Sequence, residues 1–495
     1  MAVLTNEQPH FVLFPFMAQG HMIPMIDIAR LLAQRGVIIT ILLTPSNGNR
    51  FSTVIARAIE IGLKIQVIDL YFPSSEAGLP EGCENCDMVP SIDMMKNFFL
   101  ATQMVESQVV DSLQELNPLP SCLISDMCFP WTTNVAKKFN IPRIVFHGMC
   151  SFSLLCLHNL REGKVLENAN SDTEYFSVPG FPDKVELTKA QLKTLVDPSN
   201  PEWNEFGEKI KEAEDEAYGI VVNSFEELEP EYVKRLKKAK GKKIWTIGPV
   251  SLCNKEKQDK AERGSKASID EHHCLKWLNS KEPDSVLFVC LGSLSRLPAS
   301  QMIELGLALE SSKRPFIWVI RHISDELKKW LNEENFEERI KEQGILIHGW
   351  APQVLILSHA SVGGFVTHCG WNSSIEGIST GVPMITWPLF AEQFCNERLI
   401  TNVLKTGVKS GVENPVMFLE EEKVDTQVNK DDIKMVIEKL MGEEEEAKIR
   451  RERAKKLGEI ARKAVEEGGS SHLNLTILIQ DVKEQANFLE NQFDV

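Results

Sequence analysis

Short apolar runs alternate with helical patterns along the chain, and this alternation constrains the fold more than any other feature. Residues 11–16 form an apolar run that leads through Gly20 and His21 into a helical pattern, and residues 37–43 form the next apolar run. Pro24 is expected in the first turn of that helix, with His21 just before it. Strands that alternate with helices form a parallel sheet covered on both faces, so the sequence predicts an α/β protein.

The run at 253–267 interrupts this alternation, because eight of its fifteen residues are charged and few are apolar. Such a segment is typical of a linker or a long exposed loop. The alternation then resumes with apolar runs at 286–291, 316–320, 345–347, 364–367 and 384–387. We therefore expect two Rossmann-like domains, at 1–252 and 268–470, with a linker at 253–267 between them and a helical segment at 471–495.

The composition argues against several classes of partner and site. The 495 residues include 54 Lys and Arg against 70 Asp and Glu, a formal net charge of −16. This acidity argues against a nucleic acid or an anionic membrane as partner, because both require basic surface. The first apolar stretch, at 11–18, is too short to span a bilayer. Eleven scattered cysteines, without two pairs at zinc spacing, predict a reduced cytoplasmic protein with no metal site, and a monomer is the default expectation.

The segment 350–393 carries the clearest signs of chemistry. It contains three Trp and two acids, but no Lys or Arg. Residues 363–368 predict a strand, Cys369-Gly370 a tight turn, and a helix begins near Asn372. A helix that begins directly after a strand presents free N–H groups and the positive end of its dipole to an anion.

Polar and aromatic side chains around this helix start predict a nucleotide site. Donors surround the expected anion, and a carboxylate one turn later can accept from a ribose diol. An indole can stack on a base, with a carboxamide close by. Each of these residues alone is explained by helix capping or core packing, but together they favour a site: His368, Asn372, Ser373, Glu376, Trp350 and Gln353.

His21 and Asp126 are the candidate catalytic pair. Both follow predicted strands of the first half, at 11–16 and 122–125, so they reach the carboxyl edge of the sheet, where open α/β sheets bind ligands. A carboxylate beside a neutral histidine fixes its tautomer and stabilises the imidazolium. Alone, each residue has an ordinary structural explanation; as a pair they indicate a general base.

Residues 350–393 resemble the plant secondary-product glycosyltransferase box, the nucleotide-sugar signature of plant UDP-dependent glycosyltransferases. The resemblance extends to PFMAQGHMIP at 15–24, VNSFEELE at 222–229, WTIGP at 245–249 and GGSSH at 468–472. The chain is most similar to the subgroup that glucosylates cytokinins, brassinosteroids, flavonoids and triterpenoid sapogenins. This implies the GT-B fold: an acceptor-binding and a UDP-sugar-binding Rossmann-like domain facing across a cleft, with the C-terminal helix returning to the first domain.

The resemblance also implies roles for individual residues. Those matching the family's uracil and ribose contacts are Trp350, Ala351, Gln353 and Glu376. Those matching its diphosphate contacts are His368, Asn372 and Ser373, with Ser293 as a further contact. Those matching its sugar contacts are Trp371, Glu392 and Gln393. Most members have Asp in place of Glu392. Glutamine at the last position accompanies glucose, and the box holds no Lys or Arg to pair with a glucuronate.

The expected reaction is inverting, metal-independent transfer of glucose from UDP-glucose to a hydroxyl of a hydrophobic small molecule, with His21 as base and no cofactor. No Asp-x-Asp motif is present as a metal clamp. The alternatives are a non-catalytic nucleotide-sugar or hormone-binding protein on the same fold, or an enzyme using another UDP-sugar. A dinucleotide oxidoreductase or a Walker-type hydrolase lacks its glycine motif. The acceptor itself stays unassigned, and its pocket is expected around Phe16, 80–100 and 146–157.

Overall fold

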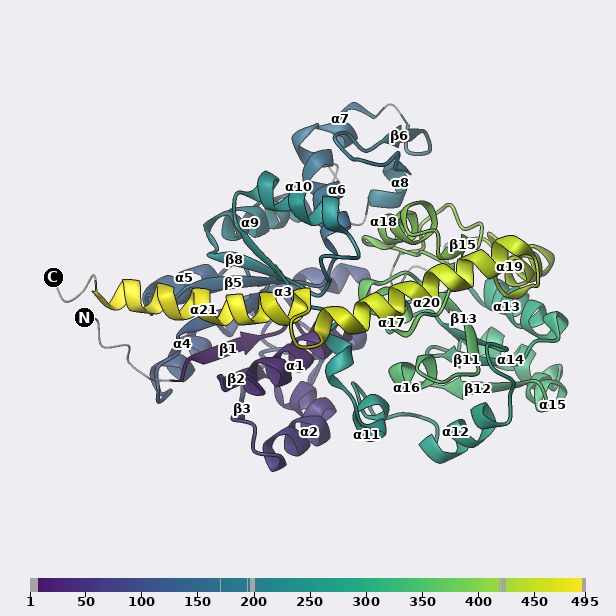
Figure 1. Ribbon diagram of the computed structural model, residues 1–495, viewed down its shortest axis with the longest axis horizontal. Helices are drawn as coiled ribbons and strands as arrows, with labels where there is room; N and C mark the ends of the chain where they lie inside the picture. Colours follow the sequence, from purple (N-terminus) through teal and green to yellow (C-terminus); the bar gives the residue numbers. More distant parts are fainter. Residues whose placement is uncertain are drawn as a thin grey trace.

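The computed structural model describes residues 8–491, except 170, 194, 196–200, 418 and 420–423. Within these residues, two parallel sheets form the centres of two α/β domains that lie side by side (Figure 1). The first sheet has the order β3-β2-β1-β4-β5-β8-β9, and the second β12-β11-β10-β13-β14-β15. A small antiparallel pair, β6 (Tyr175–Ser177) and β7 (Glu186–Thr188), stands apart from both. The predicted α/β fold with two parallel sheets is confirmed.

The strands of the two sheets are short and mostly buried. In the first sheet they are β1 His10–Phe14, β2 Ile38–Leu43, β3 Ile65–Asp69, β4 Cys122–Asp126, β5 Arg143–His147, β8 Gly219–Val222 and β9 Lys243–Thr246. In the second they are β10 Val286–Cys290, β11 Phe316–Ile320, β12 Gly344–His348, β13 Val362–Thr367, β14 Met384–Thr386 and β15 Gly407–Lys409. The central strands β1, β4, β5, β10 and β11 are buried at every position because helices cover both faces of each sheet.

Helices connect these strands and cover the sheets. Those before residue 250 are α1 Gln19–Ala33, α2 Pro45–Glu60, α3 Met95–Met104, α4 Glu106–Gln114, α5 Thr132–Lys138, α6 Ser151–Glu162, α7 Val165–Asn168, α8 Lys189–Leu192, α9 Pro201–Glu216 and α10 Pro230–Lys240. Those after it are α11 Lys257–Ala261, α12 Glu271–Asn279, α13 Ala299–Ser312, α14 Asp325–Glu333, α15 Phe336–Ile340, α16 Gln353–Leu357, α17 Trp371–Thr380, α18 Gln393–Arg398, α19 Lys430–Met441, α20 Glu445–Val465 and α21 Ser470–Asn491. None of the described helices is long and apolar enough to cross a membrane.

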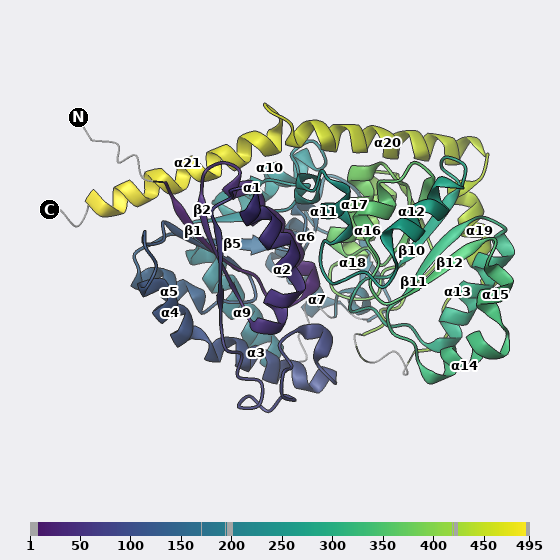
Figure 2. The same cartoon turned by 90° about the horizontal axis from the view of Figure 1, so that it is seen from below.

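The last two helices run along both domains. Figures 1 and 2 show α20 beside the second domain and α21 continuing along the first. On α21, Asp481 accepts a hydrogen bond from the indole N–H of Trp245 on β9 at 3.0 Å, and its carboxylate also pairs with Lys243. Helix α21 therefore packs against the edge strand of the first sheet.

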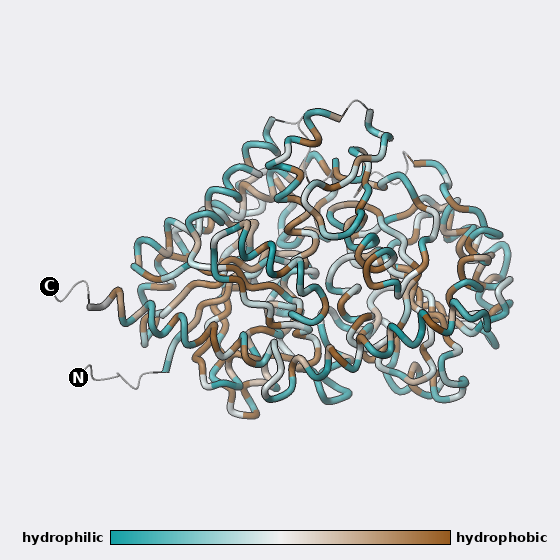
Figure 3. The backbone as a smooth tube through the Cα atoms, turned by 45° about the horizontal axis from the view of Figure 1, so that its top comes forward, coloured by the Kyte–Doolittle hydropathy of each residue, from teal (hydrophilic) through white to brown (hydrophobic). Residues whose placement is uncertain are grey.

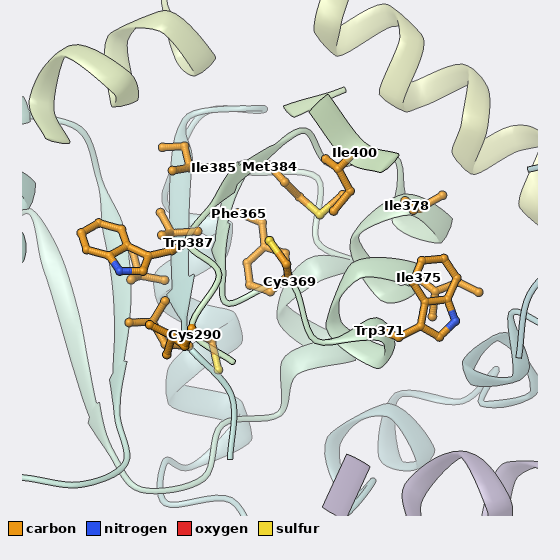
Figure 4. Close-up of a cluster of buried hydrophobic side chains, with 14 of the residues drawn as sticks. Cys290, Phe365, Cys369, Trp371, Ile375, Ile378, Met384, Ile385, Trp387 and Ile400 are labelled. Carbon is orange, nitrogen blue, oxygen red and sulfur yellow. The ribbon is translucent and has the colours of Figure 1, made fainter. Parts of the chain in front are cut away.

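The core lies between the sheets and their helices. In Figure 3 the hydrophobic colouring concentrates on the strands in the interior, while the outer helices are largely hydrophilic. Figure 4 shows the part of this core formed largely by the 350–393 segment, where Phe365, Met384 and Trp387 belong to the same buried cluster as Ile375 and Trp371 of α17. This packing holds α17, and with it the predicted anion site, in place.

Helix α1 differs from the sequence prediction. It begins at Gln19, so His21 lies in its first turn and Pro24 lies inside the helix rather than at its start. Because Pro24 has no N–H, the carbonyl of Gly20, four residues earlier, has no helical partner. That carbonyl instead accepts a hydrogen bond from the side-chain amide of Asn372 in the second domain. The proline thus frees an acceptor that connects the two domains.

The charged run at 253–267 also differs from an exposed loop. It contains α11, and Asn254, Ala261 and the side chain of Arg263 are buried. Asp259, Glu262 and Arg263 form ion pairs with residues outside the run, and Arg263 pairs with a residue of each domain, which composition alone does not reveal.

Candidate active site

A cavity of about 350 Å³ opens between the carboxyl ends of the two sheets and is lined by both domains. Every predicted site residue except Asp126 lines it, and Asp126 is buried directly behind His21. The lining members of that set are His21, Ser293, Trp350, Ala351, Gln353, His368, Trp371, Asn372, Ser373, Glu376, Glu392 and Gln393. Residues that are far apart in sequence therefore meet in one site, as the topology predicts.

His21 and Asp126 form a hydrogen-bonded pair at the first-domain wall. Asp126 is the last residue of β4, and its Oδ2 accepts a hydrogen bond from His21 Nδ1 at 2.7 Å. The Asp126 side chain is fully buried, whereas that of His21 is 26% exposed to the cavity. Since Nδ1 carries the proton, Nε2 is the basic nitrogen.

The environment of this pair shifts both pKa values. Burial alone would lower the pKa of His21, but the charge and hydrogen bond of Asp126, with a smaller effect of Glu392, raise it above its ordinary value. Burial would raise the pKa of Asp126, but the interaction with His21 and the backbone N–H of Cys128 lower it. Asp126 thus remains ionised and stabilises a protonated His21.

His368 lies between two glycines at the end of β13. A Cβ at Gly292 would stand 2.5 Å from the imidazole, and one at Gly370 would stand 2.3 Å from its Nε2, so neither position has room for a side chain. Gly292 also has φ +91°, a conformation that favours glycine. Burial lowers the pKa of His368 to about 4, so the ring is neutral at pH 7. Its Nδ1 is buried and has no hydrogen-bond partner among the described residues.

Trp371 and Asn372, at the start of α17, bind the first domain. The indole N–H of Trp371 donates to the carbonyl of Asn223 at 2.7 Å. The amide of Asn372 donates to the Gly20 carbonyl, and its oxygen accepts from Asn223 Nδ2 at 3.4 Å. In this structure the polar side-chain groups of both residues therefore join the domains. The groups that remain available to an anion at this turn are the backbone N–H groups at the start of the helix.

Glu376 is the polar centre of the end of the cavity where the sequence predicts a nucleotide. Gln353 Nε2 donates to Glu376 Oε2 at 2.7 Å and to the hydroxyl oxygen of Ser373 at 3.1 Å. Arg263 donates to the other oxygen, Oε1. Trp350 lines the cavity beside this cluster, and the Arg321 guanidinium lies over its ring, 4.4 Å from the ring centre.

Glu392 and Gln393 line the same cavity as His21. Burial raises the pKa of Glu392 above its ordinary value. Asn396 Nδ2 donates to Glu392 Oε1 at 3.3 Å. The side-chain oxygen of Gln393 accepts from the backbone N–H groups of Leu389 and Phe390, at 2.8 and 3.1 Å. Those two bonds use both lone pairs of this oxygen, so only its amide N–H groups can bind a ligand.

Each of the three regions expected around the acceptor reaches the cavity. Phe16 lines it and meets the His21 ring edge-on, with ring centres 5.4 Å apart. Cys86 and Met95 come from 80–100, and Gly148 from 146–157. This end of the cavity is largely apolar and adjoins the histidine.

Three basic residues of the cavity were missed in the sequence: Lys260, Arg263 and Arg321. Arg321 follows the predicted strand 316–320, so its place at the sheet edge could have been found from the same rule that placed His368. Lys260 and Arg263 lie in the charged run at 253–267, whose composition predicted only a solvent-exposed segment. Within the described parts of the chain, no group of three or more His, Cys, Asp or Glu could hold a metal ion.

The chain is similar to known proteins over nearly its whole length. Residues 257–425 match the family model described as UDP-glucoronosyl and UDP-glucosyl transferase. UDP-glycosyltransferase 73C3 of Arabidopsis thaliana is 59% identical over 482 residues, 97% of each chain. UDP-glycosyltransferase 73C25 of Barbarea vulgaris is 57% identical, over 98% of this chain and 99% of that one. The crystal structure of Glycyrrhiza uralensis UGT73P12, complexed with glycyrrhetinic acid 3-O-monoglucuronide, superposes with a TM-score of 0.91 at 36% identity, covering 98% of both chains.

The two domains with their parallel sheets have the fold of a GT-B glycosyltransferase. The chain belongs to the plant UDP-glycosyltransferases, and the relatives above place it with family 73C. Proteins of this family transfer a sugar from a UDP-sugar to a small molecule. The resemblance seen in the sequence is thereby confirmed.

Proposed function

We propose that the protein transfers glucose from UDP-glucose to a hydroxyl of a hydrophobic plant small molecule, with inversion to a β-O-glucoside and without a metal ion. The observation that carries this proposal is the His21–Asp126 pair, which opens on the same cavity as the start of α17 and His368. A general base and an anion site facing each other are what direct displacement of UDP by a hydroxyl requires.

In the proposed reaction, the acceptor hydroxyl binds at the apolar end of the cavity, and its proton passes to His21 Nε2. The oxygen forms a bond to the anomeric carbon of the α-linked sugar from the face opposite UDP, while the bond from that carbon to the UDP oxygen breaks. The negative charge that develops on UDP lies against the N–H groups at the start of α17, with Ser293 and Ser373 nearby. Asp126 stabilises the imidazolium that forms.

The donor preference rests on Glu392 and Gln393. The Glu392 carboxylate accepts from sugar hydroxyls and the Gln393 amide donates to them, because the Gln393 oxygen is already occupied by backbone N–H groups. Inverting one hydroxyl, as in galactose, leaves a buried polar group unpaired and costs about 1–3 kcal/mol. The 350–393 box contains no Lys or Arg, but the cavity does contain basic residues, because Arg263 and Arg321 line it. Selection against glucuronate therefore depends on where those arginines lie relative to the sugar.

A triterpenoid, steroid or flavonoid is the proposed acceptor class. UGT73P12, which has the same fold, was crystallised with a triterpenoid glucuronide, and a further neighbour, Phytolacca americana UGT2, was crystallised with pterostilbene. Phe16, Met95 and Cys86 give this chain an apolar surface beside His21 that suits such molecules.

The test is a competition of UDP-glucose, UDP-galactose and UDP-glucuronic acid on a panel of such aglycones, read by mass spectrometry. We expect hexose addition from UDP-glucose, preferred over UDP-galactose by about one to two orders of magnitude in kcat/KM. A His21→Ala variant, the control for enzymatic transfer, should lose about 10²- to 10⁴-fold in turnover while still binding UDP. Equal use of the two hexoses would refute the donor assignment, and full activity of His21→Ala would refute the mechanism.

A further inference from the structure

Arg263, in the segment between the two domains, bridges a carboxylate of each domain. Its Nε donates to Asp27 Oδ2 on α1 at 2.7 Å, and its Nη1 donates to Glu376 Oε1 on α17. The three side chains are 8%, 2% and 3% exposed. A guanidinium that makes two buried, charge-assisted contacts is held far more firmly than a surface ion pair.

The backbone around Arg263 is built to bring it there. Gly264 has φ +94°, and a Cβ at this position would stand 2.5 Å from the Trp350 ring and 3.0 Å from Ile23, so the chain passes closely between the domains. Gln19 Nε2 donates to Ser265 Oγ at 2.9 Å, and Ser268 N–H donates to the Trp350 carbonyl at 2.7 Å. The segment is therefore hydrogen-bonded to α1 on one side and to Trp350 on the other.

Charge balance explains why this arrangement is stable. Burial alone would lower the pKa of Arg263, but Asp27 and Glu376 raise it well above its ordinary value, so the guanidinium stays charged. Asp27 receives a second hydrogen bond, from Asn254 Nδ2 at 2.9 Å. Removing Arg263 would leave two buried carboxylates without their cation, a costly situation.

We propose that Arg263 is a positioning residue for ribose recognition. It holds one oxygen of Glu376 while Gln353 holds the other, and each oxygen keeps a lone pair that can accept from a ribose hydroxyl. Through Asp27 it also connects this carboxylate to α1, the helix that carries His21. The proposal rests on the assignment of Glu376 to the ribose diol under the proposed function.

The experiment compares the affinities of UDP and 2′-deoxy-UDP by calorimetry, because their ratio isolates the ribose contact from overall binding. The variants are Glu376→Gln, Arg263→Met, Arg263→Lys and the double variant Glu376→Gln with Arg263→Met. The matched control is Arg57→Met, since Arg57 pairs with Asp259 and Glu262 of the same segment but is not among the cavity-lining residues. Thermal melting checks that each variant is folded.

We expect the wild type to prefer UDP by about tenfold or more, as a hydrogen bond to a charged group implies. Glu376→Gln should lose most of this preference. Arg263→Met should lose it to a similar extent, Arg263→Lys should keep an intermediate ratio because it retains the charge, and the double variant should lose no more than Glu376→Gln alone. Arg57→Met should keep the wild-type ratio. The KM for UDP-glucose should rise about tenfold in Arg263→Met, with a smaller change in kcat.

Two results overturn the inference, and they are distinguishable. If Arg263→Met or Arg263→Lys binds both ligands more weakly but keeps the wild-type ratio, Arg263 serves only structure. If the wild type and Glu376→Gln show the same ratio, Glu376 does not contact the ribose, and this part of the proposed function fails together with the role of Arg263.

Discussion

Replacing Asp126 with Asn tests the catalytic pair with a change of a single atom. The side chain is fully buried, so a larger change would disturb the core. Asp126 Oδ1 accepts from the backbone N–H of Cys128 at 3.0 Å, while Oδ2 accepts from His21. In the variant, the Cys128 N–H requires the amide oxygen on its side, which directs the amide NH₂ toward His21. That NH₂ can only donate to Nδ1, so the proton moves to Nε2, the nitrogen that must act as base.

The size of the effect follows from these two contacts. Losing a hydrogen bond to a buried charge costs about 1.5–3 kcal/mol, or roughly 10- to 150-fold in rate. The wrong tautomer adds to this and can bring the total loss to about 10⁴-fold. Because Cys128 favours the unproductive orientation of the amide, we expect a fall in kcat of about 10³- to 10⁴-fold.

The pH dependence supplies a second readout. His21 must be unprotonated to accept a proton, and Asp126 raises its pKa, so wild-type kcat/KM should climb as pH increases through a value above the usual 6.5 of histidine. Without the Asp126 charge, burial dominates and lowers the pKa of His21. The acid limb of the variant should therefore shift to lower pH while its plateau falls.

The assay measures initial rates from pH 5 to 9 with UDP-glucose and a triterpenoid alcohol, which does not ionise in this range. Glu214→Gln is the control, because Glu214 pairs with His147 in a second buried histidine–carboxylate contact whose residues are not among those lining the cavity. It should reduce stability without moving the acid limb. An unchanged plateau in Asp126→Asn, or an acid limb that stays in place, would show that Asp126 does not act through His21.

Two further predictions concern the anion site. Gly292→Ala should weaken UDP binding at least tenfold by calorimetry, since its Cβ would stand 2.5 Å from His368, whereas Gly62→Ala, at a similar φ of +88° but with nothing within 4 Å, should leave UDP affinity unchanged. EDTA should leave turnover unchanged, because the helix start and neutral donors are proposed to stabilise UDP; a loss of activity restored by a divalent ion would contradict metal-independent transfer.

The central strands could be predicted because each contains a run of consecutive apolar residues. Strands β1, β4, β5, β10 and β11 are buried at every position, as a parallel sheet under two helical layers requires. Strand β3 carries Gln66 and Asp69, and β15 has three residues at the edge of its sheet, so neither shows a continuous apolar run. Strand β8 has only four residues, which is too short for periodicity to distinguish it from a buried loop.

The candidate site was predictable where residues follow strands, and not where side chains meet through tertiary packing. His21, Asp126 and His368 all lie at sheet edges, a position that topology determines. Arg263 lies in a charged run, and its partners Asp27 and Glu376 are 236 and 113 residues away in sequence. No local pattern distinguishes such a buried cation from a solvated one. The hydrogen bonds from the backbone N–H groups of Leu389 and Phe390 to the Gln393 oxygen likewise depend on the folded loop and could not be predicted from the sequence.

Helix α1 gives a physical reason for the two domains to act together. Gly20, Pro24 and Asp27 lie at spacings of four and three residues and therefore share one face of the helix. On that face, the Gly20 carbonyl freed by Pro24 binds Asn372, and Asp27 binds Arg263, which in turn holds Glu376. His21 lies next to Gly20 and is fixed by Asp126. The contacts that dock the second domain on α1 thus involve residues proposed to bind the UDP-sugar. We therefore expect the position of His21 relative to a bound donor to depend on this helix.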